Sequence, residues 1–388
     1  MDDDSASRRR TRRRFLGTGA SLGIAALAGC TDAFDSGEET TESPDGDGGT
    51  SAQIGSGRSP FSDRENVGGT PMSEMPPMSG ELTVYSGRGE PLVGTLIDYI
   101  EELYPDLTIR PRYDSAANLV NQIITEGQNS PADAFYSVNA GSLGALKDEG
   151  RTEALPDEVL SMVPEAFRDP DGTWIGTSGR ARAIPYNTDE WSESDIPTDI
   201  SAFPDQEQFR DDVGWAPTYS SFQAFVTAMR VLQGDEATRE WLQGMLDLGV
   251  KEYSDEFLVA QAVADGEISV GFGNHYYTLR VQAGRDDPPI DLAFTENDAG
   301  AMFNVAGAAV LDTAGDADLA ANFVRHLLSS EAQDYFARET FEYPLVPDVD
   351  PIGSLPSIDE LNPPEELDLT QLSDLEGTIE LMREVGVL

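Results

Sequence analysis

Two adjacent tyrosines, Tyr276 and Tyr277, are the residues in this chain with the most distinctive chemistry. They lie in the stretch 271–280 (GFGNHYYTLR), where a strand is predicted to lead into a turn. A phenolate oxygen is a hard, anionic ligand, so two of them side by side could hold a hard trivalent cation such as Fe³⁺. The alternative is that both are ordinary packing aromatics in a strand-to-helix connection. The pair by itself leaves both interpretations open.

The chain lacks the signature motifs of common enzyme classes. Its two lysines, Lys147 and Lys251, do not sit in a P-loop, and neither a Gly-x-Ser-x-Gly nor a His-Glu-x-x-His motif occurs. His275 and His326 are the only histidines, which disfavours a zinc site of the histidine and cysteine kind and a serine triad. The sequence therefore shows no motif of these enzyme classes, and we expect that the protein is not an enzyme.

The first 30 residues have the features of an export signal that is not part of the fold. A basic segment includes residues 11–16 (TRRRFL), which fit the twin-arginine export pattern. A short apolar stretch ends in residues 27–30 (LAGC), which resemble the lipobox of lipoproteins. We expect Cys30, the only cysteine, to carry lipid and to anchor the chain at the extracellular face of the cell membrane. No disulfide bond can form within the chain.

Residues 31–79 are rich in Asp, Glu, Gly, Ser, Thr and Pro, with few large apolar groups. Such a segment cannot bury enough apolar surface to become ordered, so we expect a disordered acidic tether between the membrane and the folded part. The roughly 300 residues that follow are enough for a sizeable core in two lobes.

The formal net charge is −46, from 71 acidic and 25 basic residues. Such self-repulsion strains a compact fold at low ionic strength, whereas molar salt shortens the screening length to roughly 3 Å. A halophilic protein explains this composition, and an acidic surface for cations or basic partners is the alternative. The acids are spread along the whole chain, which favours the halophile. Without a basic stripe beyond the signal, no nucleic-acid partner is expected.

Strands and helices alternate after the tether. This order favours a mostly parallel, doubly wound sheet, in which ligands bind outside the carboxyl ends of the strands. The first unit has predicted strands at 81–86, 107–113 and 132–138, and predicted helices at 92–103, 116–127 and 140–149. A second α/β unit follows an extended crossover at 180–187 and includes predicted helices at 223–233 and 238–249 and strands at 268–272 and 305–311.

Short stretches spread over residues 81–388 match one known family in their order. They are VYSGR (84–88), GQNSPADAFY (127–136), SGRAR (178–182), PTYSSFQ (217–223), NHYY (274–277) and EYPL (342–345). Each stretch is weak by itself, but together they are specific. The folded chain resembles the ferric-iron-binding proteins of ABC importers, a branch of the periplasmic binding-protein superfamily.

This resemblance implies an α/β fold of type II with two lobes, each a doubly wound sheet, joined by crossover strands. The lobes would close on Fe³⁺ like a hinged clamp. The expected organisation is a signal (1–30), a tether (31–79), the first part of lobe 1 (80–182), lobe 2 (183–298), a return to lobe 1 (299–350) and a C-terminal helical segment packed on lobe 2 (351–388).

The resemblance also implies a ligand set. Tyr276 and Tyr277 match the family's tyrosine pair, and Tyr219 matches a third tyrosine ligand of several members. The chain departs from the family's pattern at two places, because Gly89 stands where a histidine often occurs and Val138 replaces a glutamate ligand. Lobe 1 would then supply either no direct ligand or only Glu90.

A synergistic anion, carbonate or a similar one, would complete the coordination. Arg182, Arg180 and Arg88 are the candidates to hold it bidentately, and Asn274 matches an anion-binding position in some members. The alternative for the arginines is structural pairing between the lobes. His275 is expected to lie beside the ligands without binding the metal.

The expected partners are an ABC permease and its ATPase, together with membrane lipid through Cys30, and the protein is expected to be a monomer. Another small solute, such as a polyamine, thiamine or a phosphonate, is the alternative cargo for the same fold.

The charge makes the fold depend on salt. We expect the mature protein to lose its tertiary structure when it is dialysed from molar to millimolar salt, because unscreened repulsion between the carboxylates then opposes the compact state. Near-ultraviolet circular dichroism and thermal scans measure this loss. A cooperative thermal transition that persists in millimolar salt would contradict the expectation.

Overall fold

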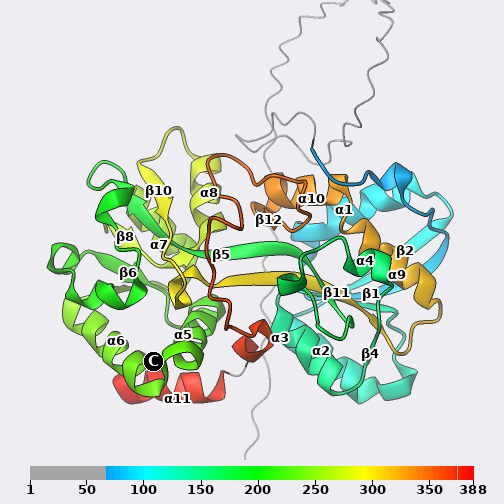
Figure 1. The fold of residues 1–388 in the computed structure, drawn as a ribbon, viewed down its shortest axis with the longest axis horizontal. Helices are drawn as coiled ribbons and strands as arrows, with labels where there is room; N and C mark the ends of the chain where they lie inside the picture. The colour runs from blue at the N-terminus through cyan, green and yellow to red at the C-terminus, as the bar shows by residue number, and fades with distance from the viewer. Residues whose placement is uncertain (1–66, 374) are drawn as a thin grey trace, which may run out of the picture. The chain divides into compact units, whose positions relative to one another are not determined.

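The computed structural model describes residues 67–373 and 375–388, which lie within one compact unit (Figure 1). The predicted signal with Cys30 lies outside the described residues, as does the tether up to residue 66. Residues 67–79 belong to the fold rather than to the predicted tether. Met72 and Met78 are buried in the core, and the backbone N–H of Met72 donates to the Glu331 carboxylate at 2.9 Å. No helix in the described part is long and apolar enough to cross a membrane.

Lobe 1 is built on a sheet in the order β2-β1-β3-β11-β5. Strand β1 (Gly80–Ser86) pairs in parallel with β2 (Leu107–Tyr113) and β3 (Ala134–Ser137), as the alternating pattern predicts. Strand β11 (Phe303–Leu311) pairs antiparallel with β3 and with the first half of β5 (Ile175–Asn187). Two short strands complete the sheet: β4 (Thr152–Glu153) pairs with β11, and β12 (Tyr343–Pro344) pairs with β5.

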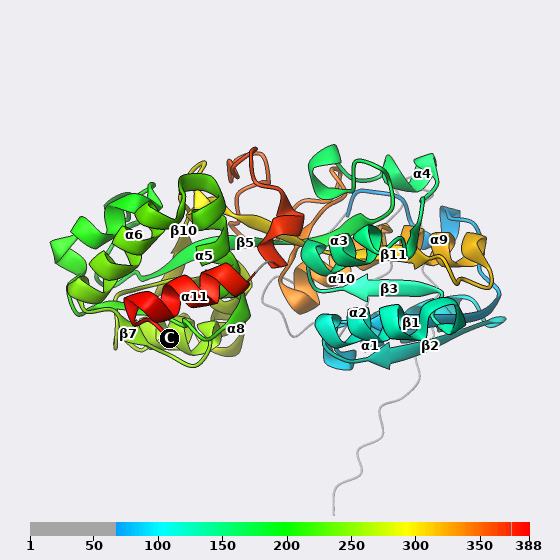
Figure 2. The ribbon, with the colours of Figure 1, turned by 90° about the horizontal axis from the view of Figure 1, so that it is seen from below.

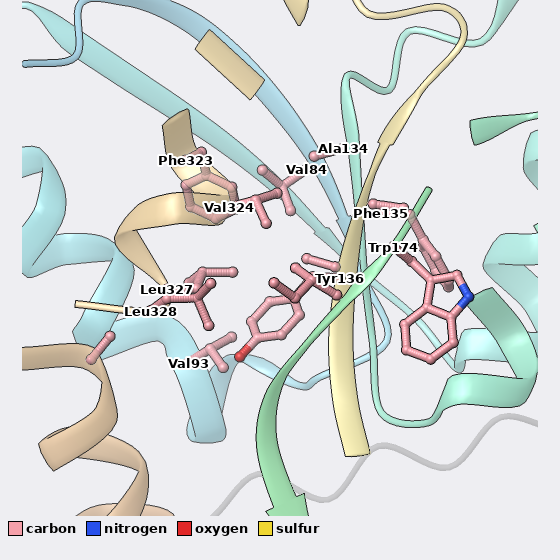
Figure 3. Close-up of a cluster of buried hydrophobic side chains, with 14 of the residues drawn as sticks. Val84, Val93, Ala134, Phe135, Tyr136, Trp174, Phe323, Val324, Leu327 and Leu328 are labelled. Atoms are coloured by element: carbon pink, nitrogen blue, oxygen red, sulfur yellow. The ribbon is translucent and has the colours of Figure 1, made fainter. Parts of the chain in front are cut away.

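The helices of lobe 1 pack their apolar faces on this sheet. Side chains from α1 and α9, among them Val93 and Phe323, gather around Val84 and Tyr136 of the strands (Figure 3). Ser115 and Asn139 begin two helices by accepting hydrogen bonds from backbone N–H groups. The helices are α1 (Glu90–Leu103), α2 (Ala116–Glu126), α3 (Ala140–Asp148), α4 (Asp157–Leu160), α9 (Ala317–His326) and α10 (Ser330–Tyr335).

Strand β5 carries the chain from lobe 1 into lobe 2. Its first half pairs with β11 and β12, and its second half pairs with β9 (Gly273–Asn274) and β10 (Ile290–Ala293). The crossover predicted at 180–187 is the second half of this strand.

Lobe 2 has parallel strands β6 (Val213–Trp215), β7 (Lys251–Glu252) and β8 (Val270–Gly271). Its core is strongly aromatic, with Trp215 and Trp241 packed edge-on against neighbouring phenylalanine rings. The helices are α5 (Ser220–Gln233), α6 (Asp235–Leu248), α7 (Glu256–Ala264), α8 (His275–Gly284) and α11 (Glu376–Val385).

The C-terminal segment joins both lobes (Figure 2). Helix α11 packs on α5 and α6, on the lobe predicted for it. Before it, the 3₁₀ helix η9 (Leu369–Ser373) contacts α3 as well as α5, and Leu369 packs against both cores. The segment 351–373 therefore contacts lobe 1 in addition to lobe 2.

Buried His326 makes the stability of lobe 1 depend on pH. Its Nε2 lies 2.9 Å from the hydroxyl of Tyr104, its Nδ1 lies 2.7 Å from the carbonyl of Asn322, and burial lowers its pKa from 6.5 to about 4. Between these values the unfolded chain binds a proton that the folded chain does not. The free energy of unfolding should therefore fall by about 1.4 kcal/mol per pH unit, about 3 kcal/mol in total, as the pH drops through this window.

Denaturant titrations in molar salt measure this effect, with His326→Gln as the reference. The unfolding free energy of the wild type minus that of His326→Gln should decrease on acidification. A difference that stays constant from pH 6.5 to 4 would contradict the prediction.

Candidate metal centre

Three tyrosines that are far apart in the sequence meet in lobe 2. Tyr219 is the residue that begins α5 after strand β6, and Tyr276 and Tyr277 lie in the first turn of α8, after β9. The hydroxyl oxygens of Tyr219 and Tyr277 are 2.5 Å apart, and the ring centroids of Tyr276 and Tyr277 are 4.3 Å apart. The structure thus brings together the three tyrosines that the family resemblance implied as ligands.

Burial keeps two of these phenols protonated. Tyr276 and Tyr277 are only 8% and 6% exposed, and burial raises the pKa of both. The neighbouring phenol of Tyr276 and the hydrogen bond with Tyr219 raise the pKa of Tyr277 further. Without a metal ion, the neutral phenol of Tyr277 shares a hydrogen bond with the Tyr219 hydroxyl. A trivalent cation that displaced the protons would find closely spaced, hard oxygen donors.

Arg280, which the sequence analysis did not single out, belongs to this cluster. Its guanidinium carbon lies 5.0 Å from the ring centroid of Tyr276 and 5.6 Å from that of Tyr277. A cation over these rings is attracted to them and favours their ionised form. The spacing was a usable signal, because residues three and four positions apart on a helix share one face.

A cavity of about 390 Å³ adjoins the cluster, between the N-termini of α2 and α3 in lobe 1 and that of α5 in lobe 2. Helix N-termini present free N–H groups and partial positive charge, which suits an anion. Arg180 and Asn274, two of the candidate anion-binding residues, line the cavity, and anion binding by them stays a prediction. Asn274 links the cavity to the tyrosine cluster, because its side-chain amide donates to the Tyr276 hydroxyl at 3.3 Å.

Both lobes contribute polar residues to this cavity that the sequence analysis missed. Except for Asn304, which lies on β11, their signal was their place as serine and asparagine residues at helix starts. Val138, at the position where the family resemblance implied a glutamate ligand, also lines the cavity, and its carbonyl accepts a hydrogen bond from Arg180. The missed residues are Ser115, Asn139, Ser142, Ser220, Ser221 and Asn304.

Two predicted anion ligands, Arg88 and Arg182, are buried in ion pairs and do not line the cavity. Arg88 donates to the Glu342 carboxylate at 2.7 Å and to Ser178 at 2.9 Å. Arg182 pairs with Glu256. The contacts of Arg88 lie within lobe 1, so they are structural pairing but not the pairing between lobes that was the alternative for the arginines. A direct role in anion binding stays a prediction for both.

The remaining predicted residues lie around the cluster. His275 is fully buried, accepts a hydrogen bond from the backbone N–H of Ala181 at 3.2 Å through Nδ1, and has a pKa that burial lowers to about 4. It is therefore a neutral side chain that joins α8 to β5. Glu90 is exposed at the start of α1 and does not line the cavity. Among the described residues, no cluster of three or more His, Cys, Asp or Glu side chains is placed to hold a metal ion.

Two α/β lobes joined by crossing strands, with a solute-sized cavity at the helix N-termini, define a solute-binding protein of the type II periplasmic-binding-protein fold, which confirms the predicted fold class. Residues 129–363 match the family described as bacterial extracellular solute-binding protein, and the chain belongs to this family. Its members are solute-binding proteins and not enzymes, which confirms the prediction of a binding protein.

Several relatives are named for iron. The major ferric iron-binding protein of Neisseria meningitidis is 30% identical over 321 residues, which cover 80% of this chain and 94% of that protein. Iron-bound HitA from Pseudomonas aeruginosa has a TM-score of 0.69 and 27% identity, with coverage of 79% of this chain and 99% of that chain. The Trichodesmium protein IdiA (FutA), in complex with iron and citrate, has a TM-score of 0.67 and 25% identity over 79% of this chain and 99% of that chain.

Proposed function

We propose that the protein is an extracellular receptor that binds Fe³⁺ through Tyr219, Tyr276 and Tyr277 and delivers it to the permease and ATPase of an ABC transporter. The observation that carries this proposal is the buried tyrosine cluster, with two phenol oxygens 2.5 Å apart and the third phenol beside them. Three phenolates would balance the charge of a ferric ion in full. The relatives named for ferric iron support the same cargo.

The adjoining cavity takes a synergistic anion in this proposal, carbonate or a similar oxyanion. Arg180 supplies positive charge, Asn274 joins the anion to the ligand Tyr276, and the helix N-termini add N–H donors. The volume of about 390 Å³ also accommodates a larger carboxylate such as citrate. The anion would fill the coordination positions that the tyrosines leave open towards lobe 1, where Glu90 is exposed.

We also propose how the chain is exported and anchored. Twin-arginine export and lipid attachment at Cys30 would hold a monomeric receptor at the extracellular face of the cell membrane. A folded domain that contains no cysteine, as the sequence provides after Cys30, is compatible with export in the folded state.

Iron binding by phenolates predicts a coloured protein. The purified protein in molar salt, incubated with ferric citrate with and without bicarbonate, should develop a phenolate-to-iron charge-transfer band in the visible range. Tyr276→Phe combined with Tyr277→Phe should abolish the band and preserve the fold. Tyr219→Phe should weaken binding by more than the roughly 10–100-fold that loss of a residue supporting a ligand typically costs.

Tyr186→Phe is the matched control, because Tyr186 is a buried tyrosine on β5 of lobe 2 outside the cluster. It should keep the band and the affinity. A wild-type protein that stays colourless with ferric citrate and is stabilised only by an organic solute would overturn the proposal and favour the alternative cargo. Full affinity in Tyr219→Phe would remove Tyr219 from the ligand set.

Acid should weaken iron binding, because the raised pKa values of Tyr276 and Tyr277 mean that binding must expel their protons. Each tyrosine that binds as a phenolate adds about one factor of ten in affinity per pH unit, so the three proposed phenolate ligands give about 1,000-fold per unit. Competition with a chelator of known pH dependence between pH 6 and 8 measures this slope. A slope of zero after correction for the chelator would show that no tyrosine gives up a proton.

A further inference from the structure

The ion pair between Arg182 and Glu256 is completely buried. Both side chains are 0% exposed, and an Arg182 Nη1 donates to Glu256 Oε1. Arg182 lies on β5 where the chain enters lobe 2, and its backbone N–H donates to the carbonyl of Met302, just before β11, at 2.8 Å. A buried ion pair gains little net stability, since the lost hydration offsets the attraction. Its position is therefore more informative than its strength.

Glu256 holds the helix that carries the tyrosine pair. Its second oxygen, Oε2, accepts a hydrogen bond at 3.0 Å from the backbone N–H of Asn274, the residue that begins α8. Asn274 is also the register partner of Arg182 in the pairing of β9 with β5. A carboxylate at the N-terminus of a helix is favourably placed in the helix dipole. One carboxylate thus fixes both the start of α8 and the crossover strand.

Arg182 contacts the other tyrosine-bearing helix. Its guanidinium carbon lies 5.5 Å from the ring centroid of Phe222 and 4.8 Å from that of Phe225, both fully buried on α5. Tyr219 begins this helix, one turn before Phe222, and its carbonyl accepts from the N–H of Gln223 at 3.1 Å. The guanidinium therefore lies between the helix of Tyr219 and the carboxylate that holds the helix of Tyr277.

We propose that the Arg182–Glu256 ion pair positions the metal centre by setting the separation of α5 and α8, and with it the distance between the Tyr219 and Tyr277 oxygens. Both members are positioning residues, and neither touches the iron. The inference rests on the proposed function and deepens it. An ion pair suits this task better than apolar packing, because the two oxygens of Glu256 fix direction as well as distance. One accepts from Arg182 and the other from the backbone N–H of Asn274.

Two variants test the proposal. Glu256→Gln keeps the volume of the side chain and an oxygen for Asn274 but removes the charge that orients Arg182. Arg182→Met combined with Glu256→Leu replaces the pair by apolar groups, so that no charge is left buried alone. Each is loaded with ferric nitrilotriacetate in molar salt. The position of the visible band, the rate of iron loss to excess EDTA and the effect of bicarbonate on both are compared with wild type.

We expect both variants to fold cooperatively, to show a shifted or weakened band and to lose iron at least tenfold faster. A purely structural pair would change the melting temperature and leave the band alone. The control is Arg151→Met combined with Asp312→Leu, which removes a partly buried ion pair of lobe 1 whose bond is 2.8 Å long. This control should keep the band and the rate of iron loss whatever its stability.

The positioning role would be overturned if Glu256→Gln and the double variant both kept the band position and the rate of iron loss of the wild type. The same conclusion follows if the double variant keeps its band and loses only its response to bicarbonate, because Arg182 would then be an anion ligand. If the double variant does not fold, Glu256→Gln alone decides. A wild-type protein that shows no band would instead overturn the proposed function.

Discussion

The antiparallel pairing of β5 with β11 is the constraint on which the other features depend. These two strands carry the chain out of lobe 1 and back, so that each lobe buries its own core while both share a sheet between them. Arg180, which lines the cavity, and Arg182, which holds Glu256, are two residues apart on β5. One strand therefore supplies both the arginine that lines the cavity and the arginine that is buried beside the two tyrosine-bearing helices. His275 is tied to Ala181 of the same strand.

The chemistry of the candidate centre follows from burial. Neutral phenols tolerate the apolar surroundings of α7 and α8, whereas isolated phenolates do not. In the proposed function, Tyr276 and Tyr277 become anionic only when a trivalent cation replaces their protons. Arg280 over the two rings and Arg180 in the cavity supply positive charge nearby. The same low exposure that raises the pKa of Tyr277 would shield a bound ion from water.

Local pattern was a reliable guide to the elements. Three elements match their predictions to within a residue at each end: β2, expected at 107–113, α2, expected at 116–127, and α3, expected at 140–149. Their apolar periodicity and the Ser115 and Asn139 caps of the two helices are local properties, which a sequence reveals directly. The end of the tether was misjudged, because burial of Met72 and Met78 depends on partners some 250 residues away. The C-terminal segment showed the same limit, since only the folded chain reveals that η9 contacts both lobes.

The sequence by itself determined the donor chemistry, the class of fold and the order of the elements, since these depend on residue type, periodicity and matching motifs. Only the tertiary structure decided how each side chain is used. Four arginines look alike in a sequence, yet Arg88 and Arg182 are paired with buried glutamates, Arg180 lines the cavity and Arg280 covers the tyrosine rings. The reason is physical. The role of a charged group is set by its partners and by its distance from water, and both are settled by long-range packing that no short motif encodes.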